Sequence, residues 1–214
     1  INLACSLDKF GLFSILSIIA SIVPSFLTFF DNMLWIGTFD EDNKGVFNAY
    51  DASKLGSAEV AVPVYYSHVP TKTQGAAFKE INEKTYLVLS RSLGRNSEKN
   101  GYVSQLEFYE PDFSSAYIKI QKSQKEIIAP PMIEGIAIYD DYMYCCFESA
   151  STLYSTIEGN LCETPTDRIC ALDVSMLFSY LKDYEPVERE RVKKRIIQIG
   201  EVLELIFFII FMLM

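Results

Sequence analysis

Apolar and β-branched residues are grouped along this chain in short runs that alternate with polar turns. The clearest runs come in pairs, and each pair is typical of a β-hairpin. These pairs are 24–30 with 33–39, 74–78 with 85–90, and 134–139 with 142–147. Further runs of the same kind follow at 45–51, 60–66, 104–109 and 116–120. The pattern predicts a mainly β protein built from antiparallel strands.

The hairpins recur at wide spacing. Phe26, Gly75 and Gly135, one in each pair, lie 49 and 60 residues apart. Repetition at this distance predicts a repeated antiparallel sheet, such as the blade of a propeller. Three blades do not close a propeller, which needs at least about four. The expected fold is therefore all-β, with an incomplete set of propeller-like blades over residues 24–175. Either the chain belongs to a longer protein, or the units form an open sheet or sandwich.

Both ends of the chain are apolar. Residues 10–30 carry no charge, a length that can cross a bilayer as a helix, but Pro24 interrupts the run. Residues 1–23 are therefore predicted to be a signal sequence, a membrane anchor or a buried segment. Residues 176–214 are predicted to be a helical tail whose end resembles the start of a membrane helix. We expect an exported or membrane-attached protein, with a small integral membrane protein as an alternative.

Composition excludes several classes of function. The chain has 19 Lys and Arg against 28 Asp and Glu, a net charge of −9 that repels phosphate backbones and argues against nucleic-acid binding. Its single histidine, His68, falls in a predicted loop, so a zinc site built on several histidines is excluded. Neither a nucleophile elbow nor a phosphate-binding glycine motif occurs. The cofactor is unknown, and the sequence does not decide whether the chain is an enzyme.

The five cysteines do not form a metal or redox motif. Cys145 and Cys146 are adjacent in a predicted strand, so their side chains should point to opposite faces. Cys162 and Cys170 bracket a polar segment, which they close as a disulfide in an oxidising compartment or flank as thiols in a reducing one.

The segment Pro130–Gly135 precedes a predicted strand and ends in a Glu-Gly pair. It resembles the strand-leading motifs of six-bladed propellers of the gluconolactonase, regucalcin and strictosidine-synthase-like group. The resemblance implies that Glu134 lies at the mouth of a central channel, where it would ligate a divalent metal in a lactonase-like hydrolase. The equivalent position of the second unit is Gln74, and the Asn and Asp ligands of other blades have no counterpart here.

Gln74 and Glu134 are therefore predicted to lie near each other at a common rim, where they can bind a hydroxyl-rich ligand or a cation. The alternative is a carboxylate in solvent at the end of a strand. Arg91 follows a strand into a loop, so it either holds an anion or pairs internally with a carboxylate such as Glu148. The favoured function is binding of a small molecule or protein without catalysis, and the hydrolase that uses Glu134 is the alternative.

Overall fold

The computed structural model describes residues 24–55, 61–92, 104–158 and 161–180. Contacts divide the chain into two units, Ile1–Asp173 and Val174–Met214, and in the second unit the helix α4 (Val174–Ser179) is described. The predicted apolar ends, residues 1–23 and the part of the tail after residue 180, lie outside the described residues. Within the described ranges, no helix is long and apolar enough to span a bilayer.

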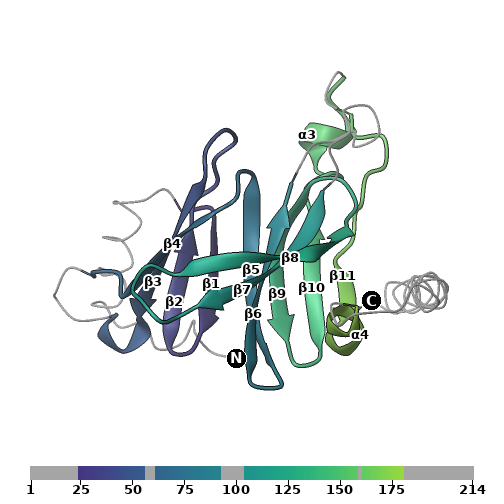
Figure 1. The fold of residues 1–214 in the computed structure, drawn as a ribbon. Coiled ribbons are helices and arrows are strands. Elements are labelled where there is room, and N and C mark those ends of the chain that lie inside the picture. Colours follow the sequence, from purple (N-terminus) through teal and green to yellow (C-terminus); the bar gives the residue numbers. More distant parts are fainter. Residues whose placement is uncertain (1–23, 56–60, 93–103, 159–160, 181–214) are drawn as a thin grey trace. The chain divides into compact units, whose positions relative to one another are not determined.

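The described residues of the first unit form three antiparallel sheets that follow one another along the chain (Figure 1). The first sheet consists of β1 (Phe26–Phe30), β2 (Met33–Gly37), β3 (Gly45–Asp51) and β4 (Tyr65–Val69). The second consists of β5 (Thr73–Ile81), β6 (Lys84–Arg91), β7 (Gln105–Asp112) and β8 (Lys119–Ile128). The third consists of β9 (Ile133–Tyr139), β10 (Tyr142–Phe147) and β11 (Cys170–Asp173). Two single turns of helix, η1 (Ala52–Lys54) and α3 (Thr152–Ser155), interrupt the connections.

Neighbours in the chain are neighbours in each sheet, so the strands run up and down without a crossover. Tight turns explain this order. Asp31 and Asn32 join β1 to β2 with φ angles of 48° and 56°, and Asn82 and Glu83 join β5 to β6 with φ angles of 50° and 63°. Two successive residues with positive φ match the twist of a hairpin, and Asn and Asp tolerate this conformation better than most residues. The mainly β, antiparallel prediction is confirmed.

An aromatic core holds the first and second sheets together. The ring of Trp35 lies 5.0 Å from the ring centroid of Phe47 and 5.0 Å from that of Phe78. Leu87 and Leu89 of β6 are buried in the same cluster. Burying one large apolar side chain stabilises a fold by about 1.5–3 kcal/mol, so this cluster is a principal source of contact between the two sheets.

The fourth strand differs from its prediction. The run at 60–66 was expected to form a strand, but β4 begins at Tyr65 and includes His68, which was expected in a loop. Pro63 has no N–H to donate to a sheet, so the strand starts beyond it. Tyr66 of β4 also forms a parallel bridge with Tyr117, just before β8.

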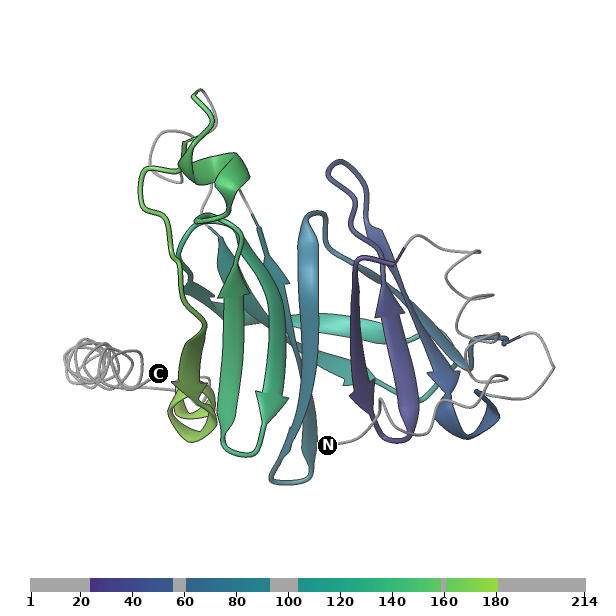
Figure 2. The ribbon, with the colours of Figure 1, turned by 180° about the vertical axis from the view of Figure 1, so that it is seen from behind.

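The first strands of the three sheets lie side by side. β5 contacts β1 on one side and β9 on the other, as both views of the ribbon show (Figure 1, Figure 2). Residues far apart in the sequence are therefore brought together where these three strands begin.

Candidate functional site

A cavity of about 470 Å³ lies where β1, β5 and β9 begin. Its lining comes from the start of each of these three strands: residues 24–27, residues 74–75 and residues 134–136. Such positions suit a binding site because strand ends offer polar groups on a rigid support.

The structure brings Gln74 and Glu134 together at this cavity. The Gln74 Nε2 donates a hydrogen bond to the Glu134 Oε1 over 3.3 Å. Both side chains are half-buried, so they are held by the fold and still reach the cavity. A carboxyl and an amide placed in this way offer a donor and several acceptors to a polar ligand.

Gln74 and Glu134 meet because β5 and β9 approach each other closely, and this close approach requires a glycine at position 75. A Cβ atom at Gly75 would lie 2.8 Å from the Ile136 nitrogen and 2.9 Å from the Glu134 carbonyl oxygen. Opposite Gly75, the Ser90 Oγ donates a hydrogen bond to the same Glu134 carbonyl over 2.6 Å. The sequence analysis did not identify Ser90 as a positioning residue. The predicted hairpin of 74–78 with 85–90 could have placed Ser90 opposite Gly75.

Glu134 has an unusual acidity. Burial, and secondly the negative charge of Glu148, raise the pKa of Glu134 to about 7. The carboxyl group is therefore both donor and acceptor near neutral pH, since about half of the molecules carry the proton. Glu148 is fixed beyond the end of β10, where its backbone N–H donates to the Met132 carbonyl over 3.0 Å.

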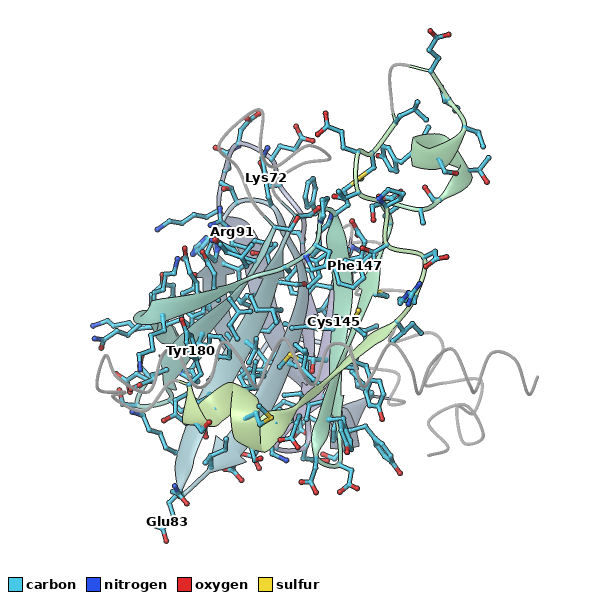
Figure 3. All side chains as sticks on the ribbon, turned by 90° about the vertical axis from the view of Figure 1, so that its right-hand side faces the viewer. Lys72, Glu83, Arg91, Cys145, Phe147 and Tyr180 are labelled. Carbon is cyan, nitrogen blue, oxygen red and sulfur yellow. The ribbon has the colours of Figure 1, made fainter. Side chains whose placement is uncertain are left out.

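Arg91 pairs internally with a carboxylate, which is one of the two alternatives given above, but this carboxylate is Glu107 and not Glu148. Its Nη1 lies 2.9 Å from the Glu107 Oε1, and its Nε donates to the Thr71 carbonyl over 2.9 Å. The reason is register, because Arg91 and Gln105 are opposite each other in β6 and β7, which brings Glu107 within reach. Figure 3 shows Arg91 on a different strand from Phe147, the residue before Glu148.

Glu107 is the centre of a buried polar cluster, which the sequence did not predict. Its Oε1 accepts hydrogen bonds from Lys122 over 2.6 Å and Gln105 over 2.6 Å, and its Oε2 accepts one from Tyr109. Burial by itself would raise the pKa of Glu107. Hydrogen bonds from Lys122 and Tyr109, together with the charge of Arg91, outweigh burial and hold that pKa below its usual value. This cluster is satisfied internally, so its evident role is in stability.

The cysteines follow the alternation expected of a strand. Cys145 is buried and Cys146 is exposed, and Figure 3 shows Cys145 and Phe147 along β10. Burial raises the pKa of Cys145 to about 12, so this thiol is a poor nucleophile at neutral pH. Cys170 lies opposite Cys145 in the register of β10 and β11, and the described cysteines, Cys162 included, carry thiols.

A metal role for Glu134 stays a prediction. Among the described residues, no group of three or more His, Cys, Asp and Glu side chains is arranged to hold a metal ion. Glu134 and Glu148 are a pair of carboxyl groups, and their repulsion is the electrostatic feature at this site that favours a cation.

No protein-family model, curated protein or solved structure matches this chain. The resemblance to six-bladed propellers therefore stays a prediction.

Proposed function

We propose that the three sheets are consecutive propeller-like blades and that the chain binds a small polar ligand, without catalysis, where their first strands begin. The observation that carries this proposal is the hydrogen bond between Gln74 and Glu134, which come from different sheets and meet at the cavity. Side chains from separate sheets that converge on one cavity are typical of a binding site.

The ligand class follows from the groups that face the cavity. A carboxyl group with a pKa near 7 and a neutral amide both donate and accept hydrogen bonds, which suits hydroxyl groups on a small molecule. The lining also contains Phe26, Leu27 and Ile136, which suit an apolar ring face or alkyl part. A hydroxyl-rich molecule with one apolar face, such as a sugar, has this chemistry.

Saturation-transfer NMR with glucose, galactose and mannose as probes tests the proposal. We expect signal transfer from the protein to at least one sugar, and we expect it to fall at least about tenfold in Gln74→Ala and Glu134→Ala, since each loses a hydrogen bond to a polar ligand. Glu110→Ala is the control, because Glu110 pairs with Lys84 at an exposed position outside the lining. Transfer that is unchanged in both site variants would show that the sugars bind elsewhere, and absent transfer would exclude this ligand class.

The alternative is a divalent-metal site that supports lactonase-like hydrolysis, and the mutual repulsion of Glu134 and Glu148 favours it. Calorimetric titration with Ca²⁺ and Zn²⁺ separates the two functions. Tight binding that is abolished by Glu134→Gln would replace the metal-free function with the metal-dependent one. We expect weak or no binding of either ion, because two carboxyl groups are fewer ligands than Ca²⁺ or Zn²⁺ usually takes from a protein.

Export or membrane attachment belongs to the same proposal, supported by the apolar composition of residues 10–23 and 203–214. Alkaline carbonate washing of membranes from expressing cells tests it. Retention of the chain in the pellet would support an integral membrane protein, whereas release into the supernatant would support an exported or peripheral one.

A further inference from the structure

The first strand of the second sheet uses its two faces for different neighbours. Side chains alternate between the faces of a strand. In β5, Ala76 and Phe78 belong to the buried cluster that contains Trp35 of the first sheet. Gly75 lies on the opposite face, where it meets the backbone of β9 at Glu134. One face of β5 therefore contacts the preceding sheet and the other contacts the following sheet.

The first sheet has the same two faces, but one of them is open. Phe26 points into the core shared with the second sheet. Leu27 and Phe29 therefore point away from it, and they occupy in β1 the places that Ala76 and Phe78 occupy in β5. Leu27 is 66% exposed and Phe29 is 51% exposed. Among the described residues, none packs over the Leu27 and Phe29 side of β1 as the first sheet packs over the equivalent side of β5.

The third sheet is open on the complementary face. Gly135 occupies in β9 the place of Gly75 in β5, and Cys146 lies against it as Ser90 lies against Gly75. A Cβ atom at Gly135 would meet the Cys146 Sγ at 3.2 Å, whereas at Gly75 it would meet the backbone of the next sheet. The register of β9 and β10 places further exposed residues on this face: Ala137, Tyr139, Tyr142 and Tyr144.

The residues that these two open faces present on β1, β9 and β10 are uncharged, in a chain of net charge −9. On the third sheet, Asp173 of β11 lies opposite Tyr142 and is a charged neighbour of the face. The face on the third sheet is formed by glycine, alanine, cysteine and three tyrosines, and Tyr139 is 59% exposed. Tyrosine is enriched at the centre of protein interfaces, where charged residues are depleted. Contiguous exposed apolar surface of this kind marks an interaction site.

We propose that the two open faces bind each other between two copies of this chain. β1 of one copy would pack on β9 and β10 of the other, and it would repeat the contact that β5 makes with β9 inside each chain. Each copy offers one face of each kind, so a two-fold arrangement makes both contacts at once. Three sheets from each copy then give an assembly of six.

On the first sheet, the proposed intermolecular contact involves β1 alone. Leu55 and Ala61 pack over Leu34, Ile36 and Tyr50, so the part of that face on β2 and β3 is already covered. The same restriction holds inside the chain, where the closest backbone contacts between sheets involve β1 with β5 and β9 with β5 and β6. The intermolecular contact therefore involves β1 of one copy with β9 and β10 of the other, in the same way as β9 lies against β5 and β6 inside the chain.

Light scattering coupled to size-exclusion chromatography, in a mild non-ionic detergent with its mass subtracted, tests the proposal on the 214-residue chain. We expect twice the single-chain mass of 24.3 kDa for the wild type. Leu27→Asp and Tyr144→Asp should each return the single-chain mass, because a charge would be buried without a partner. Ile128→Asp is the control. Ile128 is 70% exposed on β8, outside both faces, and this variant should keep the double mass.

Cross-linking provides a measurement that does not depend on destabilising a variant. The equivalence of Cys146 with Ser90 predicts that Leu27→Cys on one copy lies beside the native Cys146 of the other. A short bismaleimide should then join two chains covalently, and adding Cys146→Ser to the same variant should abolish that product. A wild-type mass of 24.3 kDa at all concentrations, a double mass that survives Leu27→Asp, or a cross-link that survives Cys146→Ser would overturn the proposal.

Discussion

Removing the carboxylate of Glu107 should be among the most destabilising substitutions in the described part of the chain. Its side chain is fully buried, and it accepts hydrogen bonds from Arg91, Lys122, Gln105 and Tyr109. Glu107→Ala leaves these donors without their acceptor, and it leaves Arg91 as a largely buried charge without its counter-ion. Breaking a buried ion pair by removing one partner costs about 3–5 kcal/mol.

The structure supports the upper part of that range for two reasons. Gln105 and Tyr109 are buried, so water does not readily replace the lost acceptor, and an unmet buried donor costs about 1–3 kcal/mol. The Arg91 side chain is 18% exposed, which leaves it little access to water. Lys122 is 41% exposed and is also paired with Glu126, so we expect it to contribute little to the loss.

Urea unfolding followed by circular dichroism measures this loss. With an m value of about 2 kcal/mol per M, a loss of about 4 kcal/mol lowers the midpoint by about 2 M. Glu110→Ala is the matched control, because Glu110 lies on the same strand and forms an exposed ion pair with Lys84, a kind worth about 0–1 kcal/mol. Glu107→Gln keeps the side-chain length and one acceptor oxygen, so its midpoint should lie between those of Glu107→Ala and Glu110→Ala. If Glu107→Ala does not fold, Glu107→Gln should still have a lower midpoint than Glu110→Ala.

The pH dependence gives a second, independent signature. The pKa of Glu107 is held below its usual value of 4.5 in the folded chain, so the unfolded chain binds the proton more readily. The carboxylate therefore stabilises the fold fully above the unfolded pKa, and this stabilisation is lost as pH falls through the folded pKa. The gap between wild type and Glu107→Ala should shrink below about pH 4.5. Equal midpoints for Glu107→Ala and Glu110→Ala at pH 7 would refute the reasoning.

Three further predictions concern the backbone and the candidate site. Gly75→Ala should cost about 1–3 kcal/mol in urea unfolding, since its Cβ would meet the backbone of β9, whereas Gly135→Ala should cost clearly less. The pKa of Glu134 is raised to about 7, so the folded chain binds this proton more tightly than the unfolded chain does. The protonated carboxyl group therefore favours the folded state, and this contribution is lost as pH rises from about 4.5 to 7. Thermal unfolding should show that Glu134→Gln is more stable than wild type at pH 8 but not at pH 4. Asn32→Val should lower stability by about 1–2 kcal/mol because φ is 56° there, while Asn32→Gly should not, and a midpoint shift of equal size in both would contradict this.

The hairpins could be predicted because each is encoded within a few residues. A turn at Asp31-Asn32 between two apolar runs specifies a local pairing, and the register Phe30 with Met33 follows directly from it. The closeness of Gln74 and Glu134 was also predicted from the sequence, and the hydrogen bond between them shows it.

The cluster around Glu107 could not be predicted because its burial depends on distant residues. The run 104–109 alternates polar and apolar residues, which indicates a half-exposed strand. In the structure both faces of β7 are covered: Leu106 and Phe108 are buried on one face, and Glu107 and Tyr109 on the other. A carboxylate tolerates this burial only because Arg91 and Lys122 arrive from neighbouring strands, and their pairing depends on sheet register. The partner of Arg91 was mistaken for the same reason.

Leu27 belongs both to the lining of the cavity and to the open face of β1. If a second copy covers that face, binding at the cavity and association of the chains are coupled, and by linkage each must change the affinity of the other by the same factor. Gln74 lines the cavity but lies on a strand between two sheets of its own chain, so Gln74→Ala should weaken sugar binding without changing the mass. Tyr144→Asp should halve the mass. If association and binding are coupled, the sugar affinity of the wild type should depend on protein concentration, whereas that of Tyr144→Asp should not. A Tyr144→Asp variant that has the single-chain mass and binds sugar as the wild type does at every concentration would show that the cavity and the interface are independent.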